Sequence, residues 1–397
     1  MILGLAKRFA TETDPRLLYK LAWNFGVKGV RSVEAYKKRL ARGEHFPPFL
    51  FLSIINSCQL RCQGCWVDVE APRKTLDLDT LNRIVNEAKQ QGNSYFGLLG
   101  GEPFLHPQLF EFLGAHPDAY FQIFTNGHLI TDGVARELRR LGNASPLVSI
   151  EGGATASDER RGRANVLDKT LAGLEACRRN KLITGVATSV CQTNIELVSE
   201  PWLRQLIAMG IHYVWFHTYR VIGPNPTASL ALRPEQVHAV RKFVVQMRAR
   251  LPIVIVDAYW DDQGQALCPM ATGVSHHISP YGDVEPCPII QFATESVTSG
   301  GKGLYETLNG SAFLRDFRET AAKHTRGCIV LERPDLVREL VVRHGAKDTT
   351  QRGRALAEIE ALEPRGSQHQ PGHEVPEEHW AYRFAKKHWF FGFGAYT

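Results

Sequence analysis

The 397-residue sequence lacks several features that define common classes of protein. No apolar run reaches the roughly 18 residues that indicate a membrane-spanning helix. The first residues, MILGLAKRFATETD, hold too short an apolar stretch for a secretory signal peptide. The sequence also shows no internal repeat and no nucleic-acid recognition module. We therefore expect a cytoplasmic protein that does not bind nucleic acid.

The charge is unevenly distributed along the chain. The formal net charge is +6, and residues 1–50 hold ten Lys and Arg side chains against four Asp and Glu. This excess, 10 − 4 = +6, equals that of the whole chain, so the remaining residues are balanced. Leu, Phe, Trp and Tyr are interleaved with the basic residues, which is typical of a basic amphipathic helix. Residues 1–47 are thus predicted either to rest on an anionic membrane surface or to pack on the rest of the protein with their charges in water.

Strand-like and helix-like segments alternate from about residue 50 to residue 260. The composition, 44% hydrophobic and 22% charged, is that of a globular protein. Six buried-strand patterns are each followed by a helical pattern. The strand patterns cover residues 49–55, 94–99, 119–124, 146–151, 185–190 and 212–219. Successive βα units imply parallel strands joined by right-handed crossovers, so we predict an α/β fold.

Polar and glycine-rich clusters follow all six strand patterns. They are CQLRCQGCW (58–66), GGEP (100–103), TNG (125–127), EGG (151–153), CQTN (191–194) and HTYR (217–220). The carboxyl ends of parallel strands form the face at which α/β barrels build their active sites. The sequence therefore predicts a functional site that collects these clusters. The side chains expected to face a substrate there are His217, Tyr219, Arg220, Asp257 and Tyr259.

Three of the eight cysteines, Cys58, Cys62 and Cys65, lie close together in the sequence. Only a loop can bring thiolates with this C-x3-C-x2-C spacing to one small centre. Iron–sulfur clusters are held by thiolates, usually four, and a cluster with three protein ligands leaves one iron open for a substrate or cofactor. Zinc is the alternative, but structural zinc sites usually use two separated pairs of ligands, and no second pair lies nearby. Buried cysteines serving as small apolar residues would not explain three thiols beside Gln, Arg and Gly.

The motifs resemble those of the radical S-adenosylmethionine (SAM) superfamily over about residues 48–265. CQLRCQGC matches the CxxxCxxC signature of that family and is followed by the aromatic Trp66, while GGEP matches its GGE motif. TNG and the stretch SIEGG…DERRG (149–162) are similar as well. The resemblance implies a partial (β/α)6 TIM-like barrel with a [4Fe-4S] cluster whose open iron is chelated by SAM. It also implies an enzyme that cleaves SAM reductively, with electrons from a reductant such as ferredoxin or flavodoxin. The resulting 5′-deoxyadenosyl radical would abstract hydrogen from an unidentified peptide or small molecule.

The resemblance further implies roles for individual residues. Cys58, Cys62 and Cys65 would ligate the cluster. Glu102 would accept a hydrogen bond from the SAM ammonium group, and Arg161 would pair with the SAM carboxylate. The residues implied in SAM binding are Trp66, Gly100, Gly101, Glu102, Pro103, Asn126, Ser149, Glu151, Arg161, Ser189 and Asn194. Ordinary capping of strand ends is the alternative for those that follow the fourth and fifth strands.

A second set of cysteines lies in the C-terminal part of the chain. CPMATGVSHHISPYGDVEPC (268–287) resembles the start of the auxiliary-cluster extension called SPASM, or its shorter form, twitch. The resemblance implies a β-hairpin that turns at Gly282, with Cys268, Cys287 and Cys328 as ligands of an auxiliary [4Fe-4S] cluster. The later CxxCxxxxxC group of SPASM proteins is missing. Either a non-cysteine residue therefore completes this cluster or one iron is open. The candidates for a fourth protein ligand are His276, His277 and His324. A structural zinc site is the alternative for the whole set.

These patterns divide the chain into four parts. The expected boundaries are 1–47 for the basic segment, 48–260 for the barrel, 261–340 for the auxiliary-cluster domain and 341–397 for a C-terminal extension with an aromatic tail. The tail suits either a membrane interface or a plug over the barrel mouth. Three functions stay open: a radical enzyme acting on a peptide, a small molecule or a lipid at a membrane; a non-enzymatic iron–sulfur redox protein; and a zinc-stabilised binding module. Only the radical enzyme gives GGEP a role.

Overall fold

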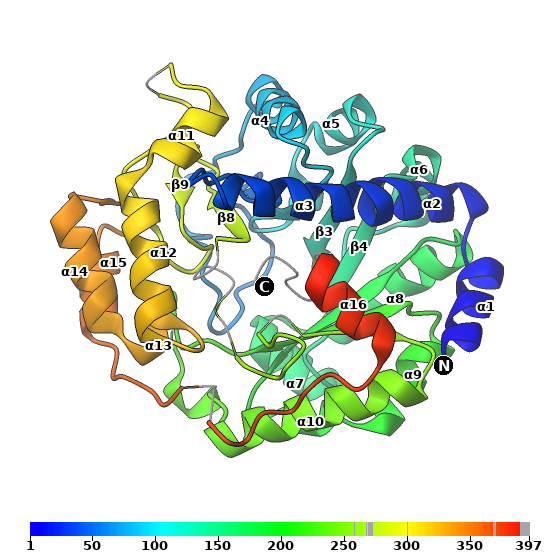
Figure 1. Ribbon diagram of the computed structural model, residues 1–397. Coiled ribbons are helices and arrows are strands. Elements are labelled where there is room, and N and C mark those ends of the chain that lie inside the picture. Colours follow the sequence, from blue (N-terminus) through cyan, green and yellow to red (C-terminus); the bar gives the residue numbers. More distant parts are fainter. Residues whose placement is uncertain are drawn as a thin grey trace.

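Figure 1 shows the computed structural model of the chain, which describes residues 1–224, 226–257, 259–266, 268, 273–299, 301–367 and 371–389. The last eight residues of the predicted aromatic tail, 390–397, lie outside the described residues. In the part that is described, no helix combines the length and the apolar character needed to cross a membrane.

One large sheet forms the framework of the fold. Its strands are β1 (Phe49–Ser53), β2 (Tyr95–Leu99), β3 (Tyr120–Thr125), β4 (Ala144–Ser149), β5 (Gly185–Val190), β6 (Tyr213–Thr218), β7 (Val254–Val256), β8 (Ser275–Ile278) and β9 (Val284–Glu285). Among the described residues their order is β7-β6-β5-β4-β3-β2-β1-β8-β9. Strands β1 to β7 run parallel to their neighbours, β8 is parallel to β1, and β9 is antiparallel to β8. The predicted α/β fold with a partial parallel barrel is confirmed, and β7 follows the six βα units as a further strand, as the apolar run at 252–260 predicts.

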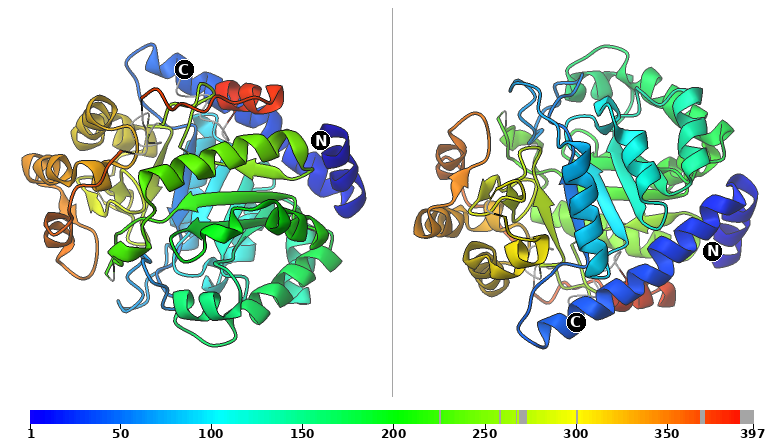
Figure 2. Two further views of the ribbon diagram at one scale, coloured as in Figure 1. Left: turned by 90° about the horizontal axis from the view of Figure 1, so that it is seen from below. Right: turned by 90° about the horizontal axis from the view of Figure 1, so that it is seen from above.

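Helices cover the outer face of this sheet (Figures 1 and 2). They are α4 (Leu78–Gln90), α5 (Leu109–Ala115), α6 (Asp132–Leu141), α7 (Ala154–Arg161), α8 (Val166–Arg179), α9 (Glu200–Ala208) and α10 (Pro234–Arg250). Helix α6 shows how local sequence sets these elements. The Thr131 side chain accepts a hydrogen bond from the Val134 N–H at its start, and Gly142 ends it in the left-handed region at φ +72°.

The N-terminal segment packs beneath the amino ends of the strands. It forms α1 (Ile2–Glu12), α2 (Pro15–Lys20), the π-helix η1 (Leu21–Val27) and α3 (Lys28–Leu40). The Asn24 side chain donates a hydrogen bond to the carbonyl of Pro117, shortly before β3. Arg8 donates to the carbonyls of Ile211 and Pro252, which precede β6 and β7. This segment therefore packs on the barrel, at the end opposite to the carboxyl ends of the strands.

The chain after β7 builds a smaller, mainly helical region next to β8 and β9 (Figure 1). Its helices are α11 (Leu304–Gly310), α12 (Ala312–His324), α13 (Ile329–Glu332), α14 (Pro334–His344) and α15 (Ala355–Glu360), and α16 (Trp380–His388) follows farther along the chain. The β8–β9 hairpin turns at Gly282, where φ is +85°, as the sequence predicts. The expected boundary at residue 341 falls inside α14, whose Val337 and Val341 are buried in the same core as Phe313 of α12.

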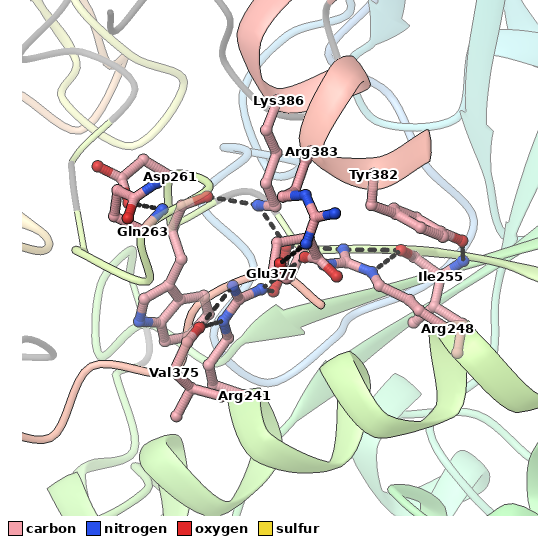
Figure 3. Close-up of polar contacts among 12 residues, drawn as sticks. Arg241, Arg248, Ile255, Asp261, Gln263, Val375, Glu377, Tyr382, Arg383 and Lys386 are labelled. Atoms are coloured by element: carbon pink, nitrogen blue, oxygen red, sulfur yellow. Dashed lines mark hydrogen bonds and ion pairs between the residues drawn. The ribbon is translucent and has the colours of Figure 1, made fainter. Parts of the chain in front are cut away.

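A buried charge cluster fixes the C-terminal segment to the barrel (Figure 3). Glu377 pairs with Arg241 and Arg248 of α10. Asp257, directly after β7, pairs with both arginines and with Lys386 of α16. Each of the five residues in this cluster is at most 2% exposed to solvent. Asp257 therefore does not face the barrel mouth, where we expected it to contact substrate, because the surrounding cations hold its carboxylate in this cluster.

Candidate active site

The loop that carries the first three cysteines follows β1 at the carboxyl end of the sheet. The N–H of Gln63 donates a hydrogen bond to the carbonyl of Arg160, which ties the loop to the end of α7. Gly64 has φ +69°, and a Cβ there would lie 2.4 Å from the ring of Tyr219. Only glycine therefore lets the loop pass over the Tyr219 ring.

Cys58, Cys62 and Cys65 line one cavity of about 530 Å³. Burial raises the pKa of the Cys58 thiol to about 11 and that of Cys65 to about 12, and neighbouring thiols of the set add to both shifts. The thiols of Cys58 and Cys65 therefore hold their protons at neutral pH, and a bound metal centre would displace them. Among the described residues no three Cys, His, Asp or Glu side chains are arranged as a ready-made ion site. The role of the three cysteines as cluster ligands thus stays a prediction.

Gly100 and Gly101 line the same cavity, beside the cysteine loop. A Cβ on Gly100 would lie 2.1 Å from the carbonyl oxygen of Ile55, and one on Gly101 would lie 2.1 Å from that of Ser57. The N–H of Gly101 donates to the Ile55 carbonyl at 2.7 Å. The two glycines therefore let the end of β2 lie directly against the backbone that leads to the first cysteine, in addition to any approach to SAM.

Glu102 is fully buried and is not among the residues that line this cavity. Its carboxylate accepts hydrogen bonds from the Thr125 hydroxyl at 2.7 Å and from the Asn126 N–H at 2.9 Å. Burial raises the pKa of Glu102 to about 6, although these hydrogen bonds oppose the shift. Glu102 thus joins the end of β2 to the end of β3, and its direct bond to SAM stays a prediction. Pro103 is also buried and begins a 3-10 turn, Pro103–Leu105.

A buried ion pair at the end of β4 contains two of the predicted SAM contacts. Arg161 Nη2 donates to Glu151 Oε1 at 2.9 Å, and Arg160 Nη2 lies 3.6 Å from Glu151 Oε2. Glu151 Oε2 is buried and accepts no hydrogen bond from the described residues. A hydroxyl group bound beside it would supply the missing donor, which fits the predicted ribose. Asn194 instead donates to the carbonyls of Glu151 and Ser189, so it holds the ends of β4 and β5 together.

The remaining predicted contacts lie on the cavity walls. Trp66, Asn126 and Ser149 line the first cavity. The Asn126 side-chain amide lies 3.9 Å from the Cys58 sulfur. The first cavity is therefore lined by the cysteine triplet, both glycines, Arg161 and these three residues. Glu102 and Asn194 do not line it, and their hydrogen bonds hold neighbouring strand ends together.

A second cavity of about 440 Å³ adjoins the first, and both are lined by Cys62, Cys65 and Trp66. Aromatic rings form part of its wall: Phe124 of β3 lies 5.8 Å from Trp215 of β6 between ring centroids. These two residues were not predicted as site residues, although the period-two alternation of side chains along a strand places them on the inner face. Four of the residues expected to face substrate do line this cavity, namely His217, Tyr219, Arg220 and Tyr259.

The second set of cysteines lies on the wall of the second cavity. Cys268, Cys287 and Cys328 all line it, although they are far apart in the sequence. Burial raises the pKa of the Cys287 thiol, and the other two thiols raise it further. The Arg220 guanidinium lies beside them, 4.6 Å above the ring of Tyr259. The second cavity is thus bounded by both cysteine sets.

None of the three histidines considered as a fourth ligand lines the second cavity, although His276 Nδ1 lies 3.5 Å from the carbonyl oxygen of Pro286, the residue before Cys287. His277 is engaged on both ring nitrogens, with Glu285 at 2.6 Å and the Ser53 hydroxyl at 2.7 Å. His276 is buried within β8, and His324 is exposed at the end of α12. The hydrogen bonds of His277 join β8 to β1 and β9, which is a structural task.

Two arginines that the sequence did not mark also line the first cavity. Arg352 and Arg354 reach it from the chain that precedes α15. Arg352 pairs with Glu358 at 2.9 Å and lies 3.7 Å from Asp68, on the segment that follows the cysteine loop. No local sequence pattern predicts that these arginines line the cavity, because only tertiary packing brings this part of the chain to it.

The fold and the site define an open parallel α/β barrel with a thiol-lined cavity at the carboxyl ends of its strands. Residues 52–196 match the family described as the Radical SAM superfamily. The AdoMet-dependent heme synthase of Methanosarcina barkeri is 28% identical over 173 residues, which are 42% of this chain and 50% of the relative. The PqqA peptide cyclase of Streptomyces rochei is 23% identical over 253 residues, 61% of this chain and 69% of the relative. Residues 52–196 of the chain therefore match a radical SAM domain.

A solved structure supports the same fold. SuiB of Streptococcus suis, bound to the precursor peptide SuiA, superposes with a TM-score of 0.62 at 16% identity, covering 74% of this chain and 75% of that one. At this identity the likeness concerns the fold alone. The chain spans about half the length of the heme synthase that it matches.

Proposed function

We propose that this chain is an enzyme that uses a [4Fe-4S] cluster and SAM to abstract hydrogen from a substrate. The observation that carries the proposal is that the cysteine triplet and the GGEP glycines line one cavity, which continues into a second, aromatic one. When bound, the cluster and SAM would supply the electron and the 5′-deoxyadenosyl group for this chemistry. A reductant such as ferredoxin or flavodoxin would be the partner.

In this proposal, one group of residues would hold the cofactors and another would enclose the substrate. Cys58, Cys62 and Cys65 would hold the cluster, while Arg161 and Glu151 Oε2, which accepts no hydrogen bond from the described residues, would orient SAM. Other wall residues of the first cavity would complete the SAM site, namely Trp66, Gly100, Gly101, Asn126 and Ser149. The aromatic wall of the second cavity would exclude water around the reacting atoms.

The second cysteine set would hold an auxiliary [4Fe-4S] cluster on the far wall of the second cavity. Cys268, Cys287 and Cys328 supply three thiols there. The fourth position would be open to the cavity or taken by a ligand other than cysteine. A substrate in the second cavity would then lie between the two clusters.

We propose a peptide segment as the substrate. The named relatives and neighbours include a peptide cyclase and an enzyme bound to a precursor peptide, which supports this class. The second candidate is a hydrophobic small molecule or lipid, which the aromatic wall of Phe124 and Trp215 would favour. A stable-isotope label in a candidate substrate distinguishes them, since hydrogen abstraction transfers that label to 5′-deoxyadenosine.

The cysteine triplet provides the first test. Replacing Cys58, Cys62 or Cys65 by Ala is expected to abolish 5′-deoxyadenosine formation in an anaerobic assay with dithionite and SAM. Cys177→Ala is the matched control, because this cysteine is buried in the core and lines neither cavity. A wild-type protein that binds iron and sulfide but releases no 5′-deoxyadenosine would identify a redox protein and contradict the proposed enzyme.

The second set is tested by counting iron. The wild-type protein is expected to bind about eight irons after anaerobic reconstitution, and replacement of Cys268, Cys287 or Cys328 by Ala should lower this to about four. These variants should still cleave SAM, because the first cluster is intact, but they should turn over substrate poorly. Zinc without sulfide in the purified protein would contradict an auxiliary iron–sulfur cluster.

A further inference from the structure

Exposed apolar side chains are concentrated at one end of the molecule. Nine large hydrophobic side chains are exposed among the described residues, and eight of them belong to α1, α2, η1, α3 and α16. The eight are Ile2, Leu3, Tyr19, Trp23, Val27, Leu40, Trp380 and Phe384. The ninth, Val342, is on α14. Both views in Figure 2 show α3 and α16 along the same edge of the molecule, beneath the amino ends of the strands.

The N-terminal part of this surface is a regular stripe. Tyr19, Trp23 and Val27 recur every four residues and are 67%, 41% and 40% exposed. Leu17 and Phe25, on the opposite side of the same helices, are buried against the barrel. This spacing places the three apolar side chains on one helix face, turned away from the protein.

Helix α16 adds a second pair to the same surface. Trp380 and Phe384 lie one turn apart and are 62% and 52% exposed. At the other end of α16, the indole N–H of Trp389 donates to the carbonyl of Phe25 in η1 at 2.7 Å. This bond fixes α16 against the N-terminal helices. We refer to the outer side of α2, η1, α3 and α16 as the basal face.

Basic residues accompany these apolar side chains. Residues 1–50 carry the whole excess of positive charge, and α16 adds the exposed side chains of Arg383 and Lys387 and no acidic side chain, while its Lys386 is buried in the charge cluster. The exposed Arg31 guanidinium lies 5.8 Å above the ring of Trp23. Aromatic residues at headgroup depth, surrounded by Lys and Arg, are what helices on anionic membrane surfaces present. A second copy of this chain would instead bring the same positive charge to the face.

We propose that the basal face docks on the surface of an anionic lipid bilayer, with its aromatic side chains at the interface and its basic side chains against the headgroups. Docking in this way turns the carboxyl ends of the strands, and hence both cavities, away from the lipid. A substrate would then enter from the aqueous side. This proposal is independent of the proposed radical chemistry, since bilayer contact requires neither cluster nor SAM.

Vesicle binding tests the proposal on the full-length protein. Co-sedimentation with mixed phosphatidylcholine–phosphatidylglycerol vesicles is expected, with far less binding to pure phosphatidylcholine and a marked loss at high salt. The triple variant Trp23→Ser/Trp380→Ser/Phe384→Ser should bind the anionic vesicles at least about tenfold more weakly than the wild type. Arg31 and Lys38 are exposed basic residues of α3, and Arg31→Gln/Lys38→Gln should weaken binding to the anionic vesicles but not to the neutral ones.

Val342→Ser is the matched control, because this exposed side chain lies on α14, away from the basal face. It should bind vesicles as the wild type does. Equal sedimentation of the wild type and the triple variant would overturn the proposal, as would equal binding to neutral and anionic vesicles. A wild-type dimer that the triple variant breaks, with no sedimentation on vesicles, would assign the face to self-association and also overturn it. All these substitutions are at exposed sites, and circular dichroism would check that the variants are folded.

Discussion

The carbonyl oxygen of Ser57 lies 2.1 Å from the position that a Cβ on residue 101 would occupy. Gly101→Ala must therefore push the end of β2 away from the chain that leads to Cys58. We expect this single methyl group to remove the first cluster, lowering the iron bound after anaerobic reconstitution by about four atoms per chain. Gly114→Ala is the control, because the nearest atom to its Cβ is at 3.6 Å. Normal iron loading in Gly101→Ala would contradict this account of the GGE motif.

A second residue-scale prediction concerns the charge of Glu102. Burial raises its pKa to about 6 in the folded protein, above the 4.5 of an unperturbed Glu. The folded state therefore holds this proton more tightly, so the stability that Glu102 contributes is present below pH 4.5 and is lost as the pH rises through about 6. Glu102→Gln should remove this component. Urea unfolding of both proteins would show their difference in unfolding free energy changing by about 2 kcal/mol between pH 4.5 and 7. A difference that does not vary with pH would contradict it.

The residues that line the cavities were easier to predict from the sequence than the residues that hold the strand ends in place. The cysteine spacing and GGEP were recognisable because a metal loop and a close backbone approach need those residue types at fixed distances. Asn194 was predicted to touch SAM, yet its hydrogen bonds go to the carbonyls of two strand ends. Arg352 could not have been found, because its position depends on how α15 and the cysteine-loop region pack together. Site residues that belong to one local segment can thus be predicted from the sequence, whereas site residues brought together from distant segments cannot.

At the scale of elements, α16 is attached through buried charges rather than through an apolar face. Glu377→Gln would leave Arg241 and Arg248 with one carboxylate fewer in an environment that excludes water. Removing one partner of a buried ion pair costs about 3–5 kcal/mol, so the free energy of unfolding should fall by roughly that amount. Chemical denaturation measures it, and the exposed Glu378→Gln provides the control. A loss below about 0.5 kcal/mol, as for surface positions, would show that the cluster does not stabilise this attachment.

Helices and strands whose own sequences contain caps or apolar runs were predictable, whereas the attachment of α16 to the barrel was not. Helix α6 follows from Thr131 as cap and Gly142 as stop, and each barrel strand follows from a short apolar run. The charge cluster involves residues from α10, from the end of β7 and from the last part of the chain, about 130 residues away. Asp257 was accordingly assigned to the barrel mouth, since its position after a strand is the same as that of true site residues.

At the scale of the whole molecule, the two cavities and the basal face lie at opposite ends of the barrel. If the basal face holds the protein on a bilayer, a lipid embedded in that bilayer cannot reach the cavities without leaving it. This arrangement favours a peptide over a membrane lipid as substrate. It also separates the two proposals in experiments, because variants of the basal face should leave SAM cleavage in solution unchanged.

The last prediction concerns the acid stability of the whole fold, which contains several buried neutral histidines. Burial, assisted by nearby cations, lowers the pKa of His116 and His212 to about 4 and that of His276 to about 3. Because these pKa values are depressed, the unfolded chain binds protons that the folded protein does not, and the stability is present above pH 6.5 and lost as the pH falls toward 4. Each histidine should contribute on the order of 1 kcal/mol to this loss between pH 6.5 and 5, whereas Glu102 and Glu285, whose pKa values are raised by burial, act in the opposite direction.

Urea unfolding at a series of pH values measures the effect of these histidines. We expect the free energy of unfolding to fall steadily from pH 6.5 downward, and His212→Gln to reduce the slope, because this side chain no longer titrates in the unfolded chain. His324→Gln is the control, since His324 is exposed on α12. A free energy of unfolding that stays constant or increases over this range would mean that these three imidazoles are protonated in the folded protein, which requires water or anions beside rings that the structure buries.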